Sequence, residues 1–201
     1  MVTFTVPAHN RQQAVRFRVP SLSVGFAGSR HLHIPQSVCK SLVDACARLD
    51  FSFYVGCAAG VDGCFRTALA SSPAAEKTIV ACAFPQRARR FSVGSLYATT
   101  VVPNGLTAKA ALHRRTVWMV RRCSLLVLFP DDCETGRWGK GSTLAFRTAL
   151  YNLKPVFVVT DYPPKPSEHY LLRRSSLFGV VDGWWVVPHP VEEGGTCDEQ
   201  W

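Results

Sequence analysis

The sequence predicts an α/β fold with a doubly wound, mostly parallel sheet of about five to seven strands and helices on both faces. Strand-like and helical segments alternate five times between residues 22 and 160, which is typical of this class. The strand-like segments are nearly continuous apolar and β-branched runs, as expected for strands covered on both faces. The 201 residues, 47% of them apolar, suffice for one domain with a sizeable core, and this composition excludes a disordered chain or a coiled coil.

Local patterns place the individual elements. Apolar residues in segment 35–49 recur with the helical period of 3.6, and Pro35 suits a first helical turn. Thr107 is a suitable N-cap for a later helix. The predicted helices are 35–49, 61–70, 107–123 and 142–153. The predicted strands are 22–27, 51–55, 77–84, 125–129 and 155–159. The stretch from Phe84 to Gly105, which contains Gly, Pro and Ser, is assigned no regular element.

The core is expected to span residues 21–160. Two short extended pieces in residues 1–20 should pack on it, and residues 161–201 should form a docked C-terminal extension with an acidic end. Eight cysteines without a Cys-x-x-Cys pair indicate buried small apolar residues rather than disulfides or a metal site. No apolar run approaches the ~20 residues of a membrane span, and no secretory signal is visible. We therefore expect a soluble, cytoplasmic protein.

Basic residues are concentrated in one part of the chain. Residues 77–130 contain nine Lys and Arg and no Asp or Glu, so this segment carries the whole net charge of +9. Such an asymmetry predicts an anionic partner, either a nucleotide, a phosphate or a nucleic acid, although a solvated basic face is the alternative. The candidates for contact with nucleic acid are Arg87, Arg89, Arg90, Arg121 and Arg122.

Three glycine-rich turns follow predicted strands and lead into helices. They are Gly28-Ser29-Arg30, the turn from Gly56 through Gly60 to Asp62, and Gly139-Lys140-Gly141-Ser142-Thr143. Glycine lets backbone N–H groups approach an anion, and the helix that follows favours negative charge at its N-terminus. The turns should meet at one edge of the sheet and form a phosphate or ribose cradle. Neither the Walker pattern nor Gly-x-Gly-x-x-Gly is present.

Other polar residues near this edge have alternative interpretations. Asp62 could accept a hydrogen bond from a ribose, but it could equally cap its helix. Arg114 and Arg115 lie on the helix before the fourth strand, as does His113. Asp131 and Asp132 could bind a ribose or a metal, or simply form a solvated loop. No arrangement of residues identifies a nucleophile, no metal site is predicted, and the cofactor expectation is limited to a nucleotide-type ligand.

These motifs resemble the SLOG superfamily, which includes DprA (Smf), the LOG proteins and YspA-like proteins. Residues 24–30 resemble the Gly-Ser-Arg turn of the DprA core, and residues 56–62 are similar to its Gly-x-Ala-x-Gly-Ile-Asp motif. Residues 141–159 match the spacing of its next turn, helix and strand. The resemblance covers about residues 22–160 and implies a Rossmann-like fold and a homo-oligomer.

Two positions depart from the family patterns. Arg115, or alternatively Arg114, stands in the place of the catalytic arginine of LOG-type phosphoribohydrolases, but Leu144 follows Thr143 where those enzymes have glutamate nearby. Arg66 stands where the second DprA motif usually has histidine. The sequence provides no general acid for glycosidic cleavage, so its catalytic residues remain unknown.

Three hypotheses follow. The first is binding of a nucleotide or nucleotide derivative, with phosphate on the first and third turns and Asp62 near the ribose. The second is DprA-like binding of single-stranded DNA along the acid-free segment, with Phe91, Tyr97 and Trp118 available for stacking. The third is a LOG-like phosphoribohydrolase that acts on nucleoside monophosphates.

Overall fold

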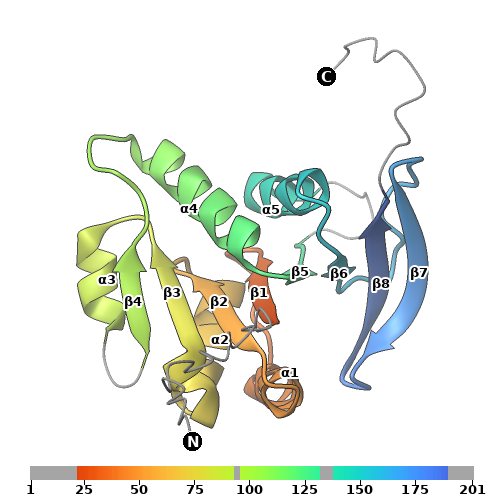
Figure 1. The fold of residues 1–201 in the computed structure, drawn as a ribbon, viewed down its shortest axis with the longest axis horizontal. Helices are drawn as coiled ribbons and strands as arrows, with labels where there is room; N and C mark the ends of the chain where they lie inside the picture. The colour runs from red at the N-terminus through yellow and green to blue at the C-terminus, as the bar shows by residue number, and fades with distance from the viewer. Residues whose placement is uncertain (1–21, 93–95, 132–137, 190–201) are drawn as a thin grey trace, which may run out of the picture.

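A computed structural model describes residues 22–92, 96–131 and 138–189 and contains one eight-stranded sheet (Figure 1). The strand order is β4-β3-β2-β1-β5-β6-β8-β7, and the first six strands in this order are parallel. The strands are β1 Ser23–Gly28, β2 Ser52–Gly56, β3 Thr78–Cys82, β4 Tyr97–Thr100, β5 Leu125–Phe129, β6 Val156–Val158, β7 Tyr170–Leu177 and β8 Val181–Pro188.

Helices cover both faces of this sheet. The face that carries α1 and α2 lies opposite the face that carries α4 and α5 (Figure 1). Residues of α3 pack against the same buried cluster as α1 and α2. The helices are α1 Gln36–Arg48, α2 Val61–Ala70, the short 3₁₀ helix η1 Pro73–Lys77, α3 Pro85–Phe91, α4 Ala108–Arg122 and α5 Lys140–Tyr151. The predicted doubly wound, Rossmann-like architecture is confirmed.

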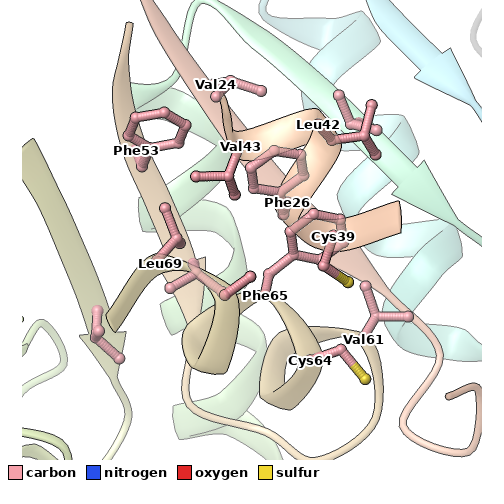
Figure 2. Close-up of a cluster of buried hydrophobic side chains, with 14 of the residues drawn as sticks. Val24, Phe26, Cys39, Leu42, Val43, Phe53, Val61, Cys64, Phe65 and Leu69 are labelled. Atoms are coloured by element: carbon pink, nitrogen blue, oxygen red, sulfur yellow. The ribbon is translucent and has the colours of Figure 1, made fainter. Parts of the chain in front are cut away.

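Aromatic rings at the centre of the sheet fix α2 against β1. The rings of Phe26 and Phe65 are stacked with 3.9 Å between their centroids, and Phe53 lies beside Phe26 (Figure 2). All three side chains are fully buried. Burial of each such ring contributes roughly 1.5–3 kcal/mol to folding. This packing holds the N-terminus of α2 at the carboxyl end of the parallel strands.

The strand order reverses at β1, which lies between β2 and β5. In open α/β sheets the crevice outside the carboxyl ends of the strands at such a point is the usual ligand site. The turns after β1, β2 and β5 all open at this edge, because these strands are parallel. The topology therefore brings the predicted glycine-rich turns to one edge of the sheet.

The predicted helices and strands between residues 22 and 160 are confirmed, with boundaries that shift by a few residues. Thr107 caps α4 as predicted, since its hydroxyl accepts a hydrogen bond from the Ala110 amide. The stretch up to Gly105, predicted as irregular, contains α3 and β4 instead. The sheet also exceeds the expected five to seven strands, because the C-terminal extension contributes the antiparallel strands β7 and β8.

Two further predictions concern the N-terminal segment and the cysteines. The extended pieces predicted in residues 1–20 lie outside the described residues. The six described cysteines are unpaired and buried, as predicted. Cys133 and Cys197 lie outside the described residues. Within the part of the chain that the structure describes, no helix has the length and apolar character that a bilayer crossing requires.

The turn between β2 and α2 depends on a glycine. Gly60 has a φ of +63°, a left-handed conformation that disfavours side chains. A Cβ at this position would also overlap the Ser29 carbonyl oxygen and the Arg30 backbone. The Val61 amide, next to it, donates a hydrogen bond to the same Ser29 oxygen at 3.0 Å. Gly60 therefore allows the first two turns to pack together.

We expect Gly60→Ala to lower the free energy of unfolding by about 2–4 kcal/mol, because backbone strain and steric overlap add. Gly141→Ala is the matched control, since a Cβ there meets no atom within 4 Å. It should change stability by less than about 0.5 kcal/mol. Urea denaturation measures both variants, and equal stabilities would contradict this role of Gly60.

Candidate functional site

The three glycine-rich turns meet in the structure. The amide of Ser29, after β1, donates to the Phe129 carbonyl of β5 at 2.9 Å. The Ser29 carbonyl accepts the hydrogen bond from α2 described above. Asp131 joins the third turn, because its carboxylate accepts from the Ser29 hydroxyl at 3.2 Å and from the Gly139 amide at 3.0 Å. The chain thus brings its predicted phosphate-binding turns into direct contact.

Two predicted phosphate donors at this junction are engaged by Asp131. The Ser29 hydroxyl donates to that carboxylate and accepts from the His31 amide at 3.0 Å. The Gly139 amide is bound to the same carboxylate. A phosphate would have to displace a negatively charged group that the start of α5 also attracts. The Asp131 carboxylate therefore joins the first and third turns and stabilises the fold at this junction.

The remaining residues of the first and third turns differ in accessibility. Gly28 packs against the backbone of Phe129, so it serves the contact between strands. Ser142 is buried, and the Thr143 hydroxyl donates to the Trp138 carbonyl at 3.3 Å. The exposed members of the two turns are Arg30, Lys140 and Gly141. Only this exposed subset faces solvent without rearrangement.

Asp62 and Arg115 form a buried ion pair. The Asp62 carboxylate accepts from Arg115 Nη1 at 3.1 Å and from the Ala58 amide at 3.1 Å, and both charged side chains are at most 6% exposed. Gly56 makes room for the pair, because a Cβ there would overlap both partners. Asp62 thus binds a loop amide and an arginine, whereas the alternative of a helix cap is not realised, because no side chain caps α2. Arg115 is equally occupied, although its buried Nε has no partner among the described residues.

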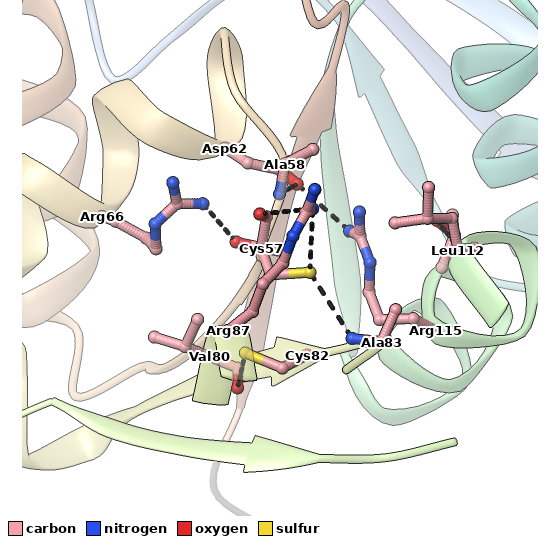
Figure 3. A network of polar contacts seen from close by, with 12 residues as sticks. Cys57, Ala58, Asp62, Arg66, Val80, Cys82, Ala83, Arg87, Leu112 and Arg115 are labelled. Carbon is pink, nitrogen blue, oxygen red and sulfur yellow. Dashed lines mark hydrogen bonds and ion pairs between the residues drawn. The ribbon is translucent and has the colours of Figure 1, made fainter. Parts of the chain in front are cut away.

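Two more arginines surround the end of β2 (Figure 3). Arg66 of α2 donates from Nη1 to the Gly56 carbonyl at 2.6 Å, and Arg87 of α3 donates to the Cys57 carbonyl at 3.0 Å. Burial lowers the pKa of Arg66, while the nearby Asp62 charge opposes this effect. With Arg115, three guanidinium groups from three different helices converge on one strand end. Asp62 neutralises one of these charges.

The positive charge acts on the Cys57 sulfur. Interaction with the neighbouring Cys82, assisted by Arg115, the Ala83 amide and Arg87, lowers the pKa of Cys57, and burial opposes this effect. The amide lies 3.5 Å and Arg87 Nη1 lies 3.7 Å from the sulfur. The environment of this strand end therefore stabilises a negative charge.

An open groove of about 730 Å³ lies beside this cluster, on the α1–α2–α3 side of the sheet. Its basic and aromatic wall consists of Arg66, Arg90 and Phe91, with the guanidinium carbons 4.2 and 5.9 Å from the ring centroid. Small residues of α2 and its N-terminal turn line another wall. No Asp or Glu occurs among the described lining residues, which are His33, Gln36, Ala59, Gly60, Gly63, Cys64, Arg66, Thr67, Ala70, Ser71, Arg90, Phe91 and Leu96.

Not all predicted nucleic-acid contacts lie near this groove. Arg89 and Arg90 are exposed on α3, on the groove side. Arg114, Arg121 and Arg122 are exposed on α4, which covers the opposite face. The Arg122 guanidinium lies 4.0 Å from the Trp118 ring centroid. The acid-free segment therefore supplies two separate basic surfaces, and Phe91 is the stacking candidate that lines the groove.

Sequence reasoning missed several groove residues. Arg66, His33 and Gln36 lie outside the basic segment 77–130 and share no sequence motif. No local pattern therefore identifies them as lining one groove.

The fold and the edge of the sheet at which the turns meet define a Rossmann-like α/β domain. DNA processing protein A from Helicobacter pylori, described with its single-stranded DNA binding mode, is similar in structure, with a TM-score of 0.53 and 19% identity. The match covers 68% of this chain and 64% of that one. DprA from Streptococcus pneumoniae gives a TM-score of 0.47 and 17% identity over 69% of this chain and 50% of its own. No protein-family model and no curated protein match the sequence.

We expect Arg115→Met to lower the free energy of unfolding by about 3–5 kcal/mol, because it leaves the buried Asp62 carboxylate without its charged partner. Asp62→Asn should also be costly. The double variant should lose less than the sum of the single losses, since neither charge remains unpaired. Urea denaturation of all four proteins tests this, and strictly additive losses would exclude a coupled pair.

Proposed function

We propose that this protein binds single-stranded DNA in the groove between α2 and α3. The observation that carries the proposal is the open basic groove, in which Arg66 and Arg90 lie over Phe91 and no described lining residue is acidic. Proteins that bind single strands combine a positive groove for the backbone with aromatic or guanidinium planes for the bases. Such contacts give little sequence preference.

The shape of the groove favours a strand over a mononucleotide. Pockets for small molecules enclose most of the ligand surface, whereas this groove is open along one side of α2. Two of the donors predicted for a nucleotide phosphate, the Ser29 hydroxyl and the Gly139 amide, are bound by Asp131. Arg115, the candidate for LOG-like chemistry, is held by Asp62. The contacts at both sites therefore give the nucleotide and phosphoribohydrolase hypotheses less support than the strand hypothesis.

The structural neighbour from H. pylori is described as binding single-stranded DNA. It supports the proposal as an example of a similar fold with this ligand. The assignment to this chain rests on the groove itself, since the matched region is only 19% identical.

We expect Arg90→Ala to weaken binding of labelled oligothymidine roughly threefold to tenfold, because an exposed phosphate contact is lost. The slope of log K against log salt should fall in magnitude by about 0.7. Arg147→Ala is the control, since this exposed arginine lies on α5 at the opposite face. Fluorescence anisotropy at several salt concentrations measures both effects. Wild-type protein without affinity for the strand, or equal losses in the two variants, would overturn the proposal.

We expect Phe91→Leu to weaken strand binding by about 1–3 kcal/mol, since leucine keeps most of the volume but has no ring for stacking. Phe146→Leu on α5 provides the control, because that ring is also half-buried but lies on the opposite face. Anisotropy titrations with folded variants, checked by circular dichroism, decide between them. Unchanged affinity in Phe91→Leu would remove this ring from the binding surface.

A further inference from the structure

Two cysteines lie side by side at the ends of neighbouring strands. Gly56 of β2 is paired with Ala81 of β3 in parallel register. Cys57 and Cys82 are the residues that follow this pair along the two strands. Neighbouring strands lie about 4.8 Å apart, which falls within the Cα–Cα range of disulfides. Both side chains belong to the same buried cluster on the α1–α2 face. The Ala83 amide, next to Cys82 in the chain, donates to the Cys57 sulfur at 3.5 Å. The two cysteines therefore occupy neighbouring positions in one buried cluster.

The surroundings prepare one of these sulfurs for reaction. Each charged or polar neighbour of Cys57 favours its thiolate: Cys82 from β3, the Ala83 amide, Arg87 from α3 and Arg115 from α4. Arg66 from α2 also interacts with the Cys57 thiolate. The nearby Asp62 carboxylate offsets part of the positive charge of Arg66. The thiolate is the nucleophilic form of cysteine. The pair thus combines a stabilised thiolate with an adjacent thiol.

The other described cysteines with resolved shifts behave differently. Burial raises the pKa of Cys39 and Cys46 to about 12 and that of Cys123 to about 11. These thiols stay protonated at neutral pH and are poor nucleophiles. Interaction with Cys57 and burial raise the pKa of Cys82. The Cys57 sulfur accepts from the Ala83 amide and lies 3.7 Å from Arg87 Nη1, whereas the Cys82 thiol donates to the Val80 carbonyl at 3.7 Å. These contacts distinguish Cys57 as the attacking group and Cys82 as the resolving group.

We propose that Cys57 and Cys82 form a modification site at which hydrogen peroxide produces a reversible disulfide. The Cys57 thiolate attacks one peroxide oxygen, the O–O bond breaks, and the departing hydroxide takes up a proton to give water. The Cys82 sulfur then attacks the resulting Cys57 sulfenic acid, the S–O bond breaks, and a second water leaves with the Cys82 proton. Two thiols and one peroxide give one disulfide and two waters, and a thiol reductant reverses the change.

Burial restricts which oxidant can act. Cys57 is 2% exposed and Cys82 is fully buried. The half-buried Arg87 side chain lies over Cys57, with its guanidinium on the carbonyl and the sulfur of this residue. Hydrogen peroxide is close to water in size, so displacement of this one side chain suffices to admit it. A peroxide therefore suits this site better than a bulky disulfide oxidant.

Peptide mapping tests the proposal directly. The folded protein is treated with hydrogen peroxide, catalase removes the excess, and free thiols are alkylated after denaturation. Trypsin cuts after Arg48, Arg66, Lys77 and Arg87, which places Cys57 in peptide 49–66 and Cys82 in peptide 78–87. We expect these two peptides to appear joined, two hydrogens lighter than their sum, and to separate after reduction. Absence of the joined peptides from peroxide-treated protein would overturn the proposal.

Peptide 49–66 also contains Cys64, so two variants assign the linkage. Cys64→Ser should still give the joined peptides, whereas Cys57→Ser should lose them entirely. A linkage that persists in Cys57→Ser and disappears in Cys64→Ser would overturn the assignment. Because the readout is a mass, it does not depend on DNA binding.

Discussion

The buried ion pair between Asp62 and Arg115 is the interaction on which the rest of the carboxyl edge depends. It links α2 on one face of the sheet to α4 on the other, and it passes over β2 where Gly56 leaves space for it. An ion pair with this burial tolerates little displacement, because neither charge has access to water. The position of α2 in turn fixes Arg66 and one wall of the groove. The geometry of the groove thus follows from a pair that no ligand needs to touch.

Local patterns were sufficient for most of the fold. The long amphipathic helices and the buried strands repeat their apolar residues often enough to be identified, and α2 begins and ends where its pattern predicted. By contrast, α3 has seven residues, none of them buried, and β4 has four. Such short, half-exposed elements show no periodic apolar pattern. Their positions depend on tertiary contacts, since β4 pairs with β3 and residues of α3 pack on the core cluster. The hairpin of β7 and β8 was missed for a related reason, because most of its residues are accessible.

The candidate site shows a different limit of sequence reasoning. The glycine turns were correctly expected at one edge, because parallel strands must end together. The sequence could not show that Asp131 lies between the Ser29 hydroxyl and the Gly139 amide, since Ser29 is 102 positions and Gly139 is eight positions from Asp131 in the chain. Whether a backbone donor is free for a ligand depends on such distant contacts. The groove has the same origin, because its wall combines residues of α2 and α3 that share no motif.

The distribution of arginines explains how one charged segment serves two purposes. Arg115 and Arg87 turn toward the end of β2, where they bind a carboxylate and a carbonyl and so support the fold. Arg89 and Arg90 of the neighbouring α3 remain exposed. The inner guanidinium groups are only partly neutralised, so they add a positive potential beneath the exposed ones, and this potential is screened less than that of surface charges. In the proposed complex a flexible anionic polymer would gain from both layers at once, since its phosphates would contact the outer arginines while the field of the inner cluster holds the strand close. A single small anion could reach only one of them.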